Sequence, residues 1–166
     1  MNKKLLIIMI LFISLFMFAC KKDNNKKDNG KTDDIVVDFG DLLGEEYLYA
    51  KVKDEVLKLK LEDNKAAKNL YQEIKKADLE LNADDFEEFA KYVKLNSIDD
   101  KDIKEIDVKV GDVVIDKDNN LYIFFKNYTG SYQKVASISN ANSENLQSTL
   151  GYEEENIKIK LSVNNK

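Results

Sequence analysis

The sequence predicts a mainly β protein in which residues 47–163 form a small closed β-barrel with two or three short helices. Three observations support this prediction. A hydrophobic period of two recurs along most of the segment, a period near 3.6 interrupts it only briefly, and polar turns separate the periodic stretches. A hairpin, a helix, several strands, a short helix and a closing strand, in that order, are typical of a barrel whose ends are covered by helices.

The first predicted elements are a β-hairpin and a helix. Apolar and polar side chains alternate in Tyr47–Val52 and in Val56–Leu61, and residues 53–55 supply the turn between them. Asp63 or Asn64 can cap the helix that follows. One face of that helix carries apolar side chains at helical spacing, namely Ala66, Ala67, Leu70, Tyr71 and Ile74.

A short strand and a second helical stretch are predicted next. Leu79 and Leu81 alternate as in a strand. From Ala83 to Tyr92 the apolar spacing predicts one or two helical turns after an Asn82 cap, with a loop as the alternative. The apolar residues behind this prediction are Phe86, Phe89, Ala90 and Val93.

The second half of the domain is predicted to consist of strands separated by polar turns. Residues 108–115 form a strand that is broken at Gly111-Asp112, and residues 116–120 form a polar turn. The continuous apolar run Leu121–Phe125 is typical of a central strand. Gly130 and Ser131 precede a further strand at residues 132–138.

The last elements are a short helix and a closing strand. Ser143 can cap a helix that ends at Leu150, and Gly151 stands where a left-handed conformation is common. Residues 156–163 alternate strictly between apolar and polar side chains, which predicts a strand with one buried face.

Aromatic residues supply the candidate binding site. Alternation places Tyr122 and Phe124 on one face of their strand, so that one face lines the barrel and the other meets helices or solvent. Most aromatic residues in such positions belong to the core. Tyr128 and Tyr132, beside Gly130, are the ones expected to be exposed, where a tyrosine offers an apolar ring and a polar hydroxyl to a ligand. The candidate binding rim is therefore Tyr122, Phe124, Tyr128 and Tyr132.

The N-terminal segment resembles a bacterial lipoprotein signal peptide. Two lysines, Lys3 and Lys4, precede the apolar run Leu5–Phe18, and Ala19 precedes Cys20, the only cysteine in the chain. At roughly 1.5 Å per residue this run is too short to span a hydrocarbon core of about 30 Å. The resemblance implies that residues 1–19 are removed and that Cys20 carries acyl chains such as palmitate. The protein is then expected on the extracytoplasmic face of the bacterial cell membrane; the alternative is a plain secretory signal.

Composition suggests a tether and excludes some partners. Residues 21–34 contain no apolar side chain, so we expect residues 20–46 to be a lipidated cysteine followed by a disordered tether. A single cysteine leaves no intramolecular disulfide. The net charge of −5 becomes −7 once Lys3 and Lys4 are removed. Nucleic acid is therefore not an expected partner, because affinity for it depends on basic groups.

Missing residue types exclude several chemistries. The chain has no histidine, arginine, tryptophan or proline, which removes histidine-based nucleophiles and histidine metal sites. Asp116, Asp118 and Asn120 match the start of a calcium loop, but Leu121 and Asn127 stand where that loop requires glycine and glutamate. These residues are therefore assigned to a turn, and neither a metal nor a cofactor is expected.

Paired carboxylates are the remaining catalytic candidates. Such pairs can serve as the acid and base of a glycosidase. In a chain with 31 acidic residues, however, they are expected to be solvated surface. The candidates are Asp84, Asp85, Glu87, Glu88, Asp99, Asp100 and Glu153–Glu155.

Across residues 47–163 the chain resembles the small bacterial cyclophilin-like domain. The matching pieces occur in the order of that family, and between them, at residues 84–89, the chain lacks the family's glycine pair and proline. The resemblance implies a barrel and raises the hypothesis of prolyl isomerase activity. Active cyclophilins use an arginine, which this chain lacks, and a lysine does not reproduce its planar fork of donors. The pieces are Asp63-Asn64-Lys-Ala66-Ala67 with Leu70, Gly111-Asp112, Leu121–Lys126, Ser131-Tyr132, Ile138 and Leu150-Gly151.

The favoured prediction is therefore a lipid-anchored extracytoplasmic domain that binds a protein, a peptide or a small ligand and does not catalyse a reaction. Its contact with the membrane is through the lipid. The alternative is an enzyme, either a divergent peptidyl-prolyl isomerase or a carboxylate-dependent hydrolase. Carboxylates that converge around an open pocket would favour the enzyme, and a barrel mouth filled by aromatic side chains would favour the binding module.

Overall fold

The computed structural model describes residues 46–165, and the predicted signal peptide, Cys20 and nearly all of the predicted tether lie outside them. No helix within residues 46–165 has both the length and the apolar character needed to cross a membrane. The two helices are α3 (Lys65–Lys76) and α4 (Ser143–Leu150). The strands are β1 (Tyr47–Val52), β2 (Glu55–Leu61), β3 (Leu79–Phe86), β4 (Ala90–Lys94), β5 (Lys104–Val108), β6 (Asp112–Ile115), β7 (Asn120–Phe124), β8 (Tyr128–Ser137) and β9 (Lys158–Ser162).

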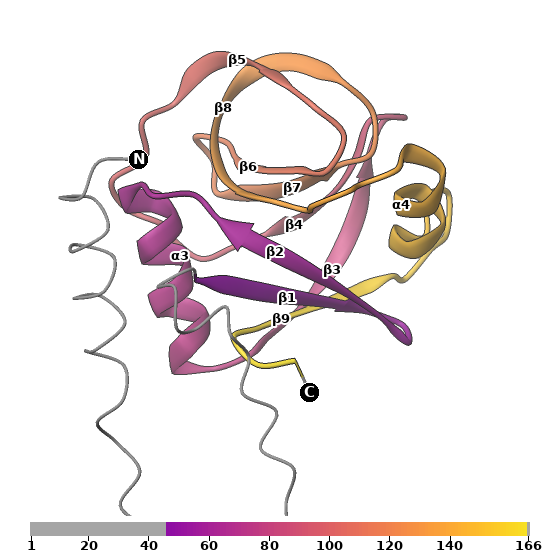
Figure 1. The fold of residues 1–166 in the computed structure, drawn as a ribbon, viewed down its shortest axis with the longest axis horizontal. Coiled ribbons are helices and arrows are strands. Elements are labelled where there is room, and N and C mark those ends of the chain that lie inside the picture. The colour runs from indigo at the N-terminus through magenta and orange to yellow at the C-terminus, as the bar shows by residue number, and fades with distance from the viewer. Residues whose placement is uncertain (1–45, 166) are drawn as a thin grey trace, which may run out of the picture. The chain divides into compact units, whose positions relative to one another are not determined.

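The strands form a closed antiparallel barrel, as predicted. Their order is β2-β1-β9-β3-β4-β7-β6-β8-β5, and a further pairing of β2 with β8 joins Leu61 to Ala136 and closes a ring of eight strands. β5 lies outside that ring and pairs with the first half of β8. The helices α3 and α4 lie at opposite ends of the barrel strands (Figure 1).

The first hairpin and its helix agree with the sequence predictions. β1 and β2 pair in register from Tyr47 opposite Lys60 to Val52 opposite Glu55. Asn64 is the N-cap of α3, because its side-chain oxygen accepts a hydrogen bond from Ala67 N at 2.9 Å. The apolar face of α3 is buried through Ala66, Ala67, Leu70 and Ile74.

The helix predicted between Ala83 and Tyr92 is wrong, and so is its Asn82 cap. The segment is a β-hairpin in which β3 and β4 pair from Ala83 opposite Val93 to Phe86 opposite Ala90. Glu87 adopts a φ of 48°, which reverses the chain at that point. The apolar residues that suggested a helical face instead serve two different cores, because alternate strand residues point to opposite faces.

The second half contains two differences from the predicted strands. Gly111, with a φ of 88°, separates β5 from β6 as the predicted break required, but β5 itself begins at Lys104 and was not predicted. β8 begins at Tyr128 rather than at Tyr132, so Gly130 lies within a strand and does not precede one. The run at β7 is fully buried from Leu121 to Phe125, as expected of a central strand.

The C-terminal elements follow the prediction with a shift of one or two residues. The cap of α4 is Asn142, whose side-chain oxygen accepts from Asn145 N at 3.2 Å, and Ser143 is the first helical residue. Gly151 is left-handed with a φ of 66° and ends the helix. β9 is shorter than the predicted segment but keeps its alternation, with Ile159 and Leu161 buried.

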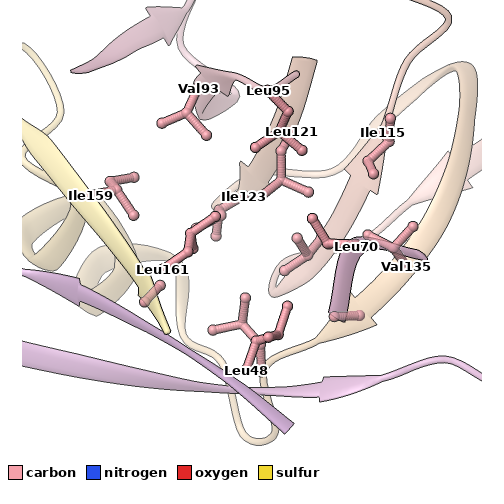
Figure 2. Packing of buried hydrophobic residues seen from close by; sticks show 14 of the residues in the cluster. Leu48, Leu70, Val93, Leu95, Ile115, Leu121, Ile123, Val135, Ile159 and Leu161 are labelled. Carbon is pink, nitrogen blue, oxygen red and sulfur yellow. The ribbon is translucent and has the colours of Figure 1, made fainter. Parts of the chain in front are cut away.

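The main core fills the barrel interior. Figure 2 shows Leu48 of β1, Leu70 of α3 and Leu161 of β9 pointing into one interior space. Leu121 and Ile123 of β7 reach the same space from the other side of the barrel. The odd-numbered face of β7 therefore lines the barrel.

The opposite face of β7 belongs to a second core outside the barrel. Tyr122 and Phe124 point into it, so this face is covered mainly by other strands and not by helices or open solvent as predicted. β5 and β8 curl beside β6 and β7 and cover it (Figure 1). The second core consists of buried Ala90, Val108, Val114, Tyr122, Phe124 and Tyr132 with partly buried Phe86, Phe89, Tyr92, Ile106 and Tyr128.

Candidate functional site

A cleft of about 260 Å³ opens beside the second core. Three tyrosines line it: Tyr122 from β7, and Tyr128 and Tyr132 from β8. Its other sides are formed by the turn at residues 116–118 and by the backbone around Gly130. We call this space the tyrosine cleft, and it combines apolar ring surface with hydroxyl and carboxylate oxygens.

All four residues of the predicted rim come together in the structure. The ring centroids of Tyr122 and Tyr132 are 5.3 Å apart, and those of Phe124 and Tyr128 are 5.8 Å apart. Their exposure differs from the prediction, because Tyr132 is only 7 % exposed and Phe124 is 0 % exposed. The three tyrosines line the cleft, while Phe124 is packed behind them and does not line it.

Gly130 allows the two tyrosines of β8 to converge. Residues 128, 130 and 132 share one face of the strand, with Gly130 between the rings. A Cβ at Gly130 would lie 2.6 Å from Tyr132 Cε2 and 3.0 Å from Tyr128 Cε1. Ile106 of β5 is the cross-strand partner of Gly130. Any larger residue at position 130 must therefore displace a ring that lines the cleft.

Asp116 organises the turn at the base of the cleft. Its Oδ1 accepts from Asp118 N at 2.8 Å and from Asn120 N at 2.9 Å, and its Oδ2 accepts from Asn120 Nδ2 at 2.7 Å. The Tyr122 hydroxyl donates to Oδ2 at 3.0 Å. These contacts are those of an Asx turn, which agrees with the turn assigned to this segment from sequence. Within residues 46–165 no cluster of three or more acidic or cysteine side chains is placed to hold a metal ion.

The pKa values of the Asp116 carboxyl group and of the Tyr122 and Tyr132 hydroxyl groups in the cleft are shifted in opposite directions. Burial raises the pKa of Asp116, but hydrogen bonds from Asn120, Tyr122 and Asp118 outweigh burial and leave the pKa below its usual value. Burial, with the nearby Asp116 carboxylate, raises the pKa of Tyr122. Burial, then Tyr128 and Asp116, raises the pKa of Tyr132 to about 12. At neutral pH the Asp116 carboxylate is therefore ionised, and the Tyr122 and Tyr132 hydroxyls are neutral.

Replacing Asp116 with alanine should lower the free energy of unfolding by about 1–2 kcal/mol at pH 7, because several backbone and side-chain donors lose their acceptor. The pKa of Asp116 is lower in the folded state, so its contribution is complete above the unfolded value near 3.8 and disappears as the pH falls through the folded value. Urea unfolding at several pH values measures both effects.

The matched control for that prediction is Asp118→Ala. Asp118 is an exposed carboxylate in the same turn, and its backbone N–H, which the substitution keeps, makes the contact with Asp116. Its free energy of unfolding should change by no more than about 0.5 kcal/mol. Equal losses in the two variants, or a loss at Asp116 that does not shrink in acid, would contradict the assigned role.

A buried lysine was not predicted. Lys91 of β4 is 1 % exposed, and its Nζ donates to Asp85 Oδ1 and to Gly151 O, each at 2.8 Å. Asp85 Oδ2 also accepts from Glu153 N at 3.2 Å. Lys91 therefore ties the β3–β4 hairpin to the C-terminal end of α4, where a cation is favourable. Lys91 lies two residues before Val93, so strand alternation places both side chains on the inward face of β4. This alternation is the sequence signal that could have identified Lys91 as buried.

The other carboxylate candidates do not line the tyrosine cleft. Asp85 pairs with Lys91, Glu88 pairs with Lys126, and Glu154 pairs with Lys53. Asp99 and Asp100 border a separate hollow of about 230 Å³ beside α3. The structure therefore brings Asp116 and Asp118, rather than these residues, to the tyrosines.

Comparison with protein families places this chain in a family. The model of the Cyclophilin-like family matches residues 50–162, which includes the second half of β1, all of β2 to β9 and both helices described above. Comparison with curated proteins and with solved structures gives no match. The second core and the tyrosine cleft both fall within the matched residues.

Proposed function

Since the chain belongs to the cyclophilin-like family, we propose that it is a lipid-anchored extracytoplasmic module that binds a ligand in the tyrosine cleft without transforming it. The ligand is a small molecule or a side chain of a peptide or protein. The cleft volume of about 260 Å³ suits a group of that size. The observation that carries this proposal is the convergence of Tyr122, Tyr128 and Tyr132 on one open space.

Tyrosines suit a binding role in this position. Each ring offers apolar surface and each hydroxyl can donate or accept a hydrogen bond, which is the combination found in small-ligand sites. The rings are held by neighbours: Tyr122 stacks on Tyr92 at 5.3 Å, and Tyr128 meets Phe86 edge to face at 5.2 Å. The cleft walls are therefore organised before a ligand arrives, which reduces the entropy lost on binding.

The carboxylates of the cleft favour binding over acid–base catalysis. A glycosidase needs one carboxyl with a raised pKa as proton donor and a second as base or nucleophile. Asp116 has a lowered pKa and already accepts several hydrogen bonds, so it is a poor proton donor. Isomerase chemistry needs a donor aimed at the prolyl nitrogen. The only lysine that lines the cleft, Lys117, is an exposed point charge.

The membrane part of the proposal is based on sequence alone. Cys20 follows a short apolar run and is the only thiol in the chain. Two acyl chains at about 0.8 kcal/mol per buried methylene anchor a protein stably, whereas one chain is marginal. The tether between Cys20 and β1 would then separate the barrel from the bilayer surface.

Nuclear magnetic resonance of the full chain in a non-ionic detergent tests the binding site. A mixture of neutral, cationic and anionic fragments should move the amide signals of Lys117, Asp118 and Ser131. Gly130→Ala should abolish these shifts, because a methyl group there collides with the rings of Tyr128 and Tyr132. Ser148→Ala, an exposed change on α4, is the control and should leave the shifts unchanged. Shifts confined to other surfaces, or none at millimolar fragment, would contradict the proposal.

A further inference from the structure

We propose that the ligand group taken by the tyrosine cleft is an organic cation, that is, an ammonium group carried on an alkyl chain. This inference rests on the proposed binding function of the cleft and adds the chemical class of the ligand. A lysine side chain of a peptide and a free alkylammonium compound share this chemistry.

The charged groups that line the cleft have an excess of negative charge. Asp116 and Asp118 contribute two carboxylates, and Lys117 contributes one ammonium on an exposed side chain. Asp116 remains ionised because its hydrogen bonds stabilise the charged form. A cationic group in the cleft is therefore attracted, and an anionic group is repelled.

The tyrosines add to this preference. Aromatic faces carry negative potential and attract cations, and hydroxyl oxygens accept hydrogen bonds from an ammonium group. Burial is the main cause of the raised pKa of Tyr132, and the Asp116 carboxylate adds to it, so that carboxylate opposes added negative charge beside Tyr132. The same potential favours a positive charge. Ring surface, hydroxyl oxygens and carboxylate charge thus act in the same direction.

Two lysines beside the cleft, Lys94 and Lys101, donate to backbone carbonyls of its turn and not to its carboxylates; Lys94 Nζ donates to Asp118 O. Lys104 lies opposite Tyr132 across the β5–β8 pairing, but its Nζ donates to Asp102 Oδ2 at 2.6 Å. Lys101 lies near the turn and donates to Lys117 O at 3.0 Å. Within residues 46–165, the lysines that stand over tyrosine rings stand over Tyr47 and Tyr71, which are not cleft residues.

Calorimetry on the full chain in non-ionic detergent at low ionic strength tests the inference with matched probes. The cationic probes are n-butylammonium and N-acetyl-lysine methylamide, and the neutral probe is N-acetyl-norleucine methylamide, which lacks only the ammonium group. We expect the lysine amide to bind about tenfold more tightly than the norleucine amide. Raising the salt concentration to 0.5 M should remove most of that difference. n-Butylammonium separates the two sources, because it carries the same ammonium group and alkyl chain without the peptide part.

Substitutions at two neighbouring residues should change the affinity for the lysine amide in opposite directions. Asp118→Asn removes an exposed carboxylate from the cleft and should weaken binding of the lysine amide about threefold. Lys117→Gln removes the competing ammonium and should strengthen binding by a similar factor. Both side chains are exposed, so neither change should disturb the fold. A general loss of structure would weaken binding of the lysine amide in both variants, so it cannot explain a decrease in one variant and an increase in the other.

Equal affinity for the lysine and norleucine amides would overturn the cationic class while leaving the cleft as a binding site. Weaker binding by Lys117→Gln would overturn it in the same way. No binding of any probe at 50 mM would overturn the inference, and would also count against the proposed function if the fragment mixture moved no cleft amide. Tighter binding of the cationic probe with opposite signs in the two variants would support it.

Discussion

Replacing Phe124 with alanine should lower the free energy of unfolding by about 3–5 kcal/mol. Phe124 is 0 % exposed, and its ring meets those of Phe86, Tyr122, Tyr128 and Tyr132. Truncation leaves a cavity between β7 and the strands that cover it, and the surrounding rings are held by their other neighbours. Denaturant unfolding followed by tyrosine fluorescence measures the loss.

The control for Phe124→Ala is Val56→Ala on β2. Val56 is 40 % exposed, so its truncation should change the free energy of unfolding by no more than about 0.5 kcal/mol. Hydrogen exchange adds a local readout, because the amides of β5 should lose protection before those of β1. A loss below about 1 kcal/mol at Phe124 would mean that the second core is not packed, and the cleft would then lack rigid walls.

Replacing Cys20 with alanine should move the protein from the membrane fraction to the soluble fraction almost completely. The proposed anchor is the pair of acyl chains on that cysteine. Fractionation with an alkaline wash measures the partition, and mass spectrometry of the N-terminal peptide measures the modification.

Lys22→Ala is the matched control for the anchor, because it changes a neighbouring residue and keeps the thiol. That variant should remain in the membrane fraction and carry the acylated peptide. Retention of Cys20→Ala in the membrane would contradict the proposed lipid anchor. A free thiol with residues 1–19 still attached in the parent chain would contradict it as well.

Sequence periodicity predicted the barrel strands that bury one regular face. β1, β2 and β9 alternate clearly, and β7 is a continuous apolar run because both of its faces are buried. The cap at Asn64 and the stop at Gly151 were also readable, since each depends on local backbone chemistry.

The hairpin formed by β3 and β4 could not be predicted from the sequence pattern, for a physical reason. Phe86, Phe89, Ala90 and Val93 are spaced as on a helix, but Phe86, Phe89 and Ala90 enter the second core and Val93 enters the main core. A single-core interpretation requires one apolar face and therefore favours a helix. Tertiary context overrode this local pattern.

The covering strand and the buried lysine were missed for a related reason. β5 carries three charged residues in five, so only its pairing with β8 and the burial of Val108 mark it as a strand. Lys91 follows an inward alternation, but lysine is assigned to solvent unless a buried partner is known. The aromatic rim was predicted as a set of residues, while the second core that organises it was not.

The tyrosines themselves provide the most direct test of the central claim, that the second core builds a cleft which binds a cation. The chain has eight tyrosines, and 3-fluorotyrosine gives each of them a separate fluorine resonance that Tyr→Phe variants assign. Titration with n-butylammonium should shift the resonances of Tyr128 and Tyr132 most and leave that of Tyr71 on α3 unchanged. Unchanged resonances for Tyr128 and Tyr132, or equal shifts at Tyr71, would contradict the account.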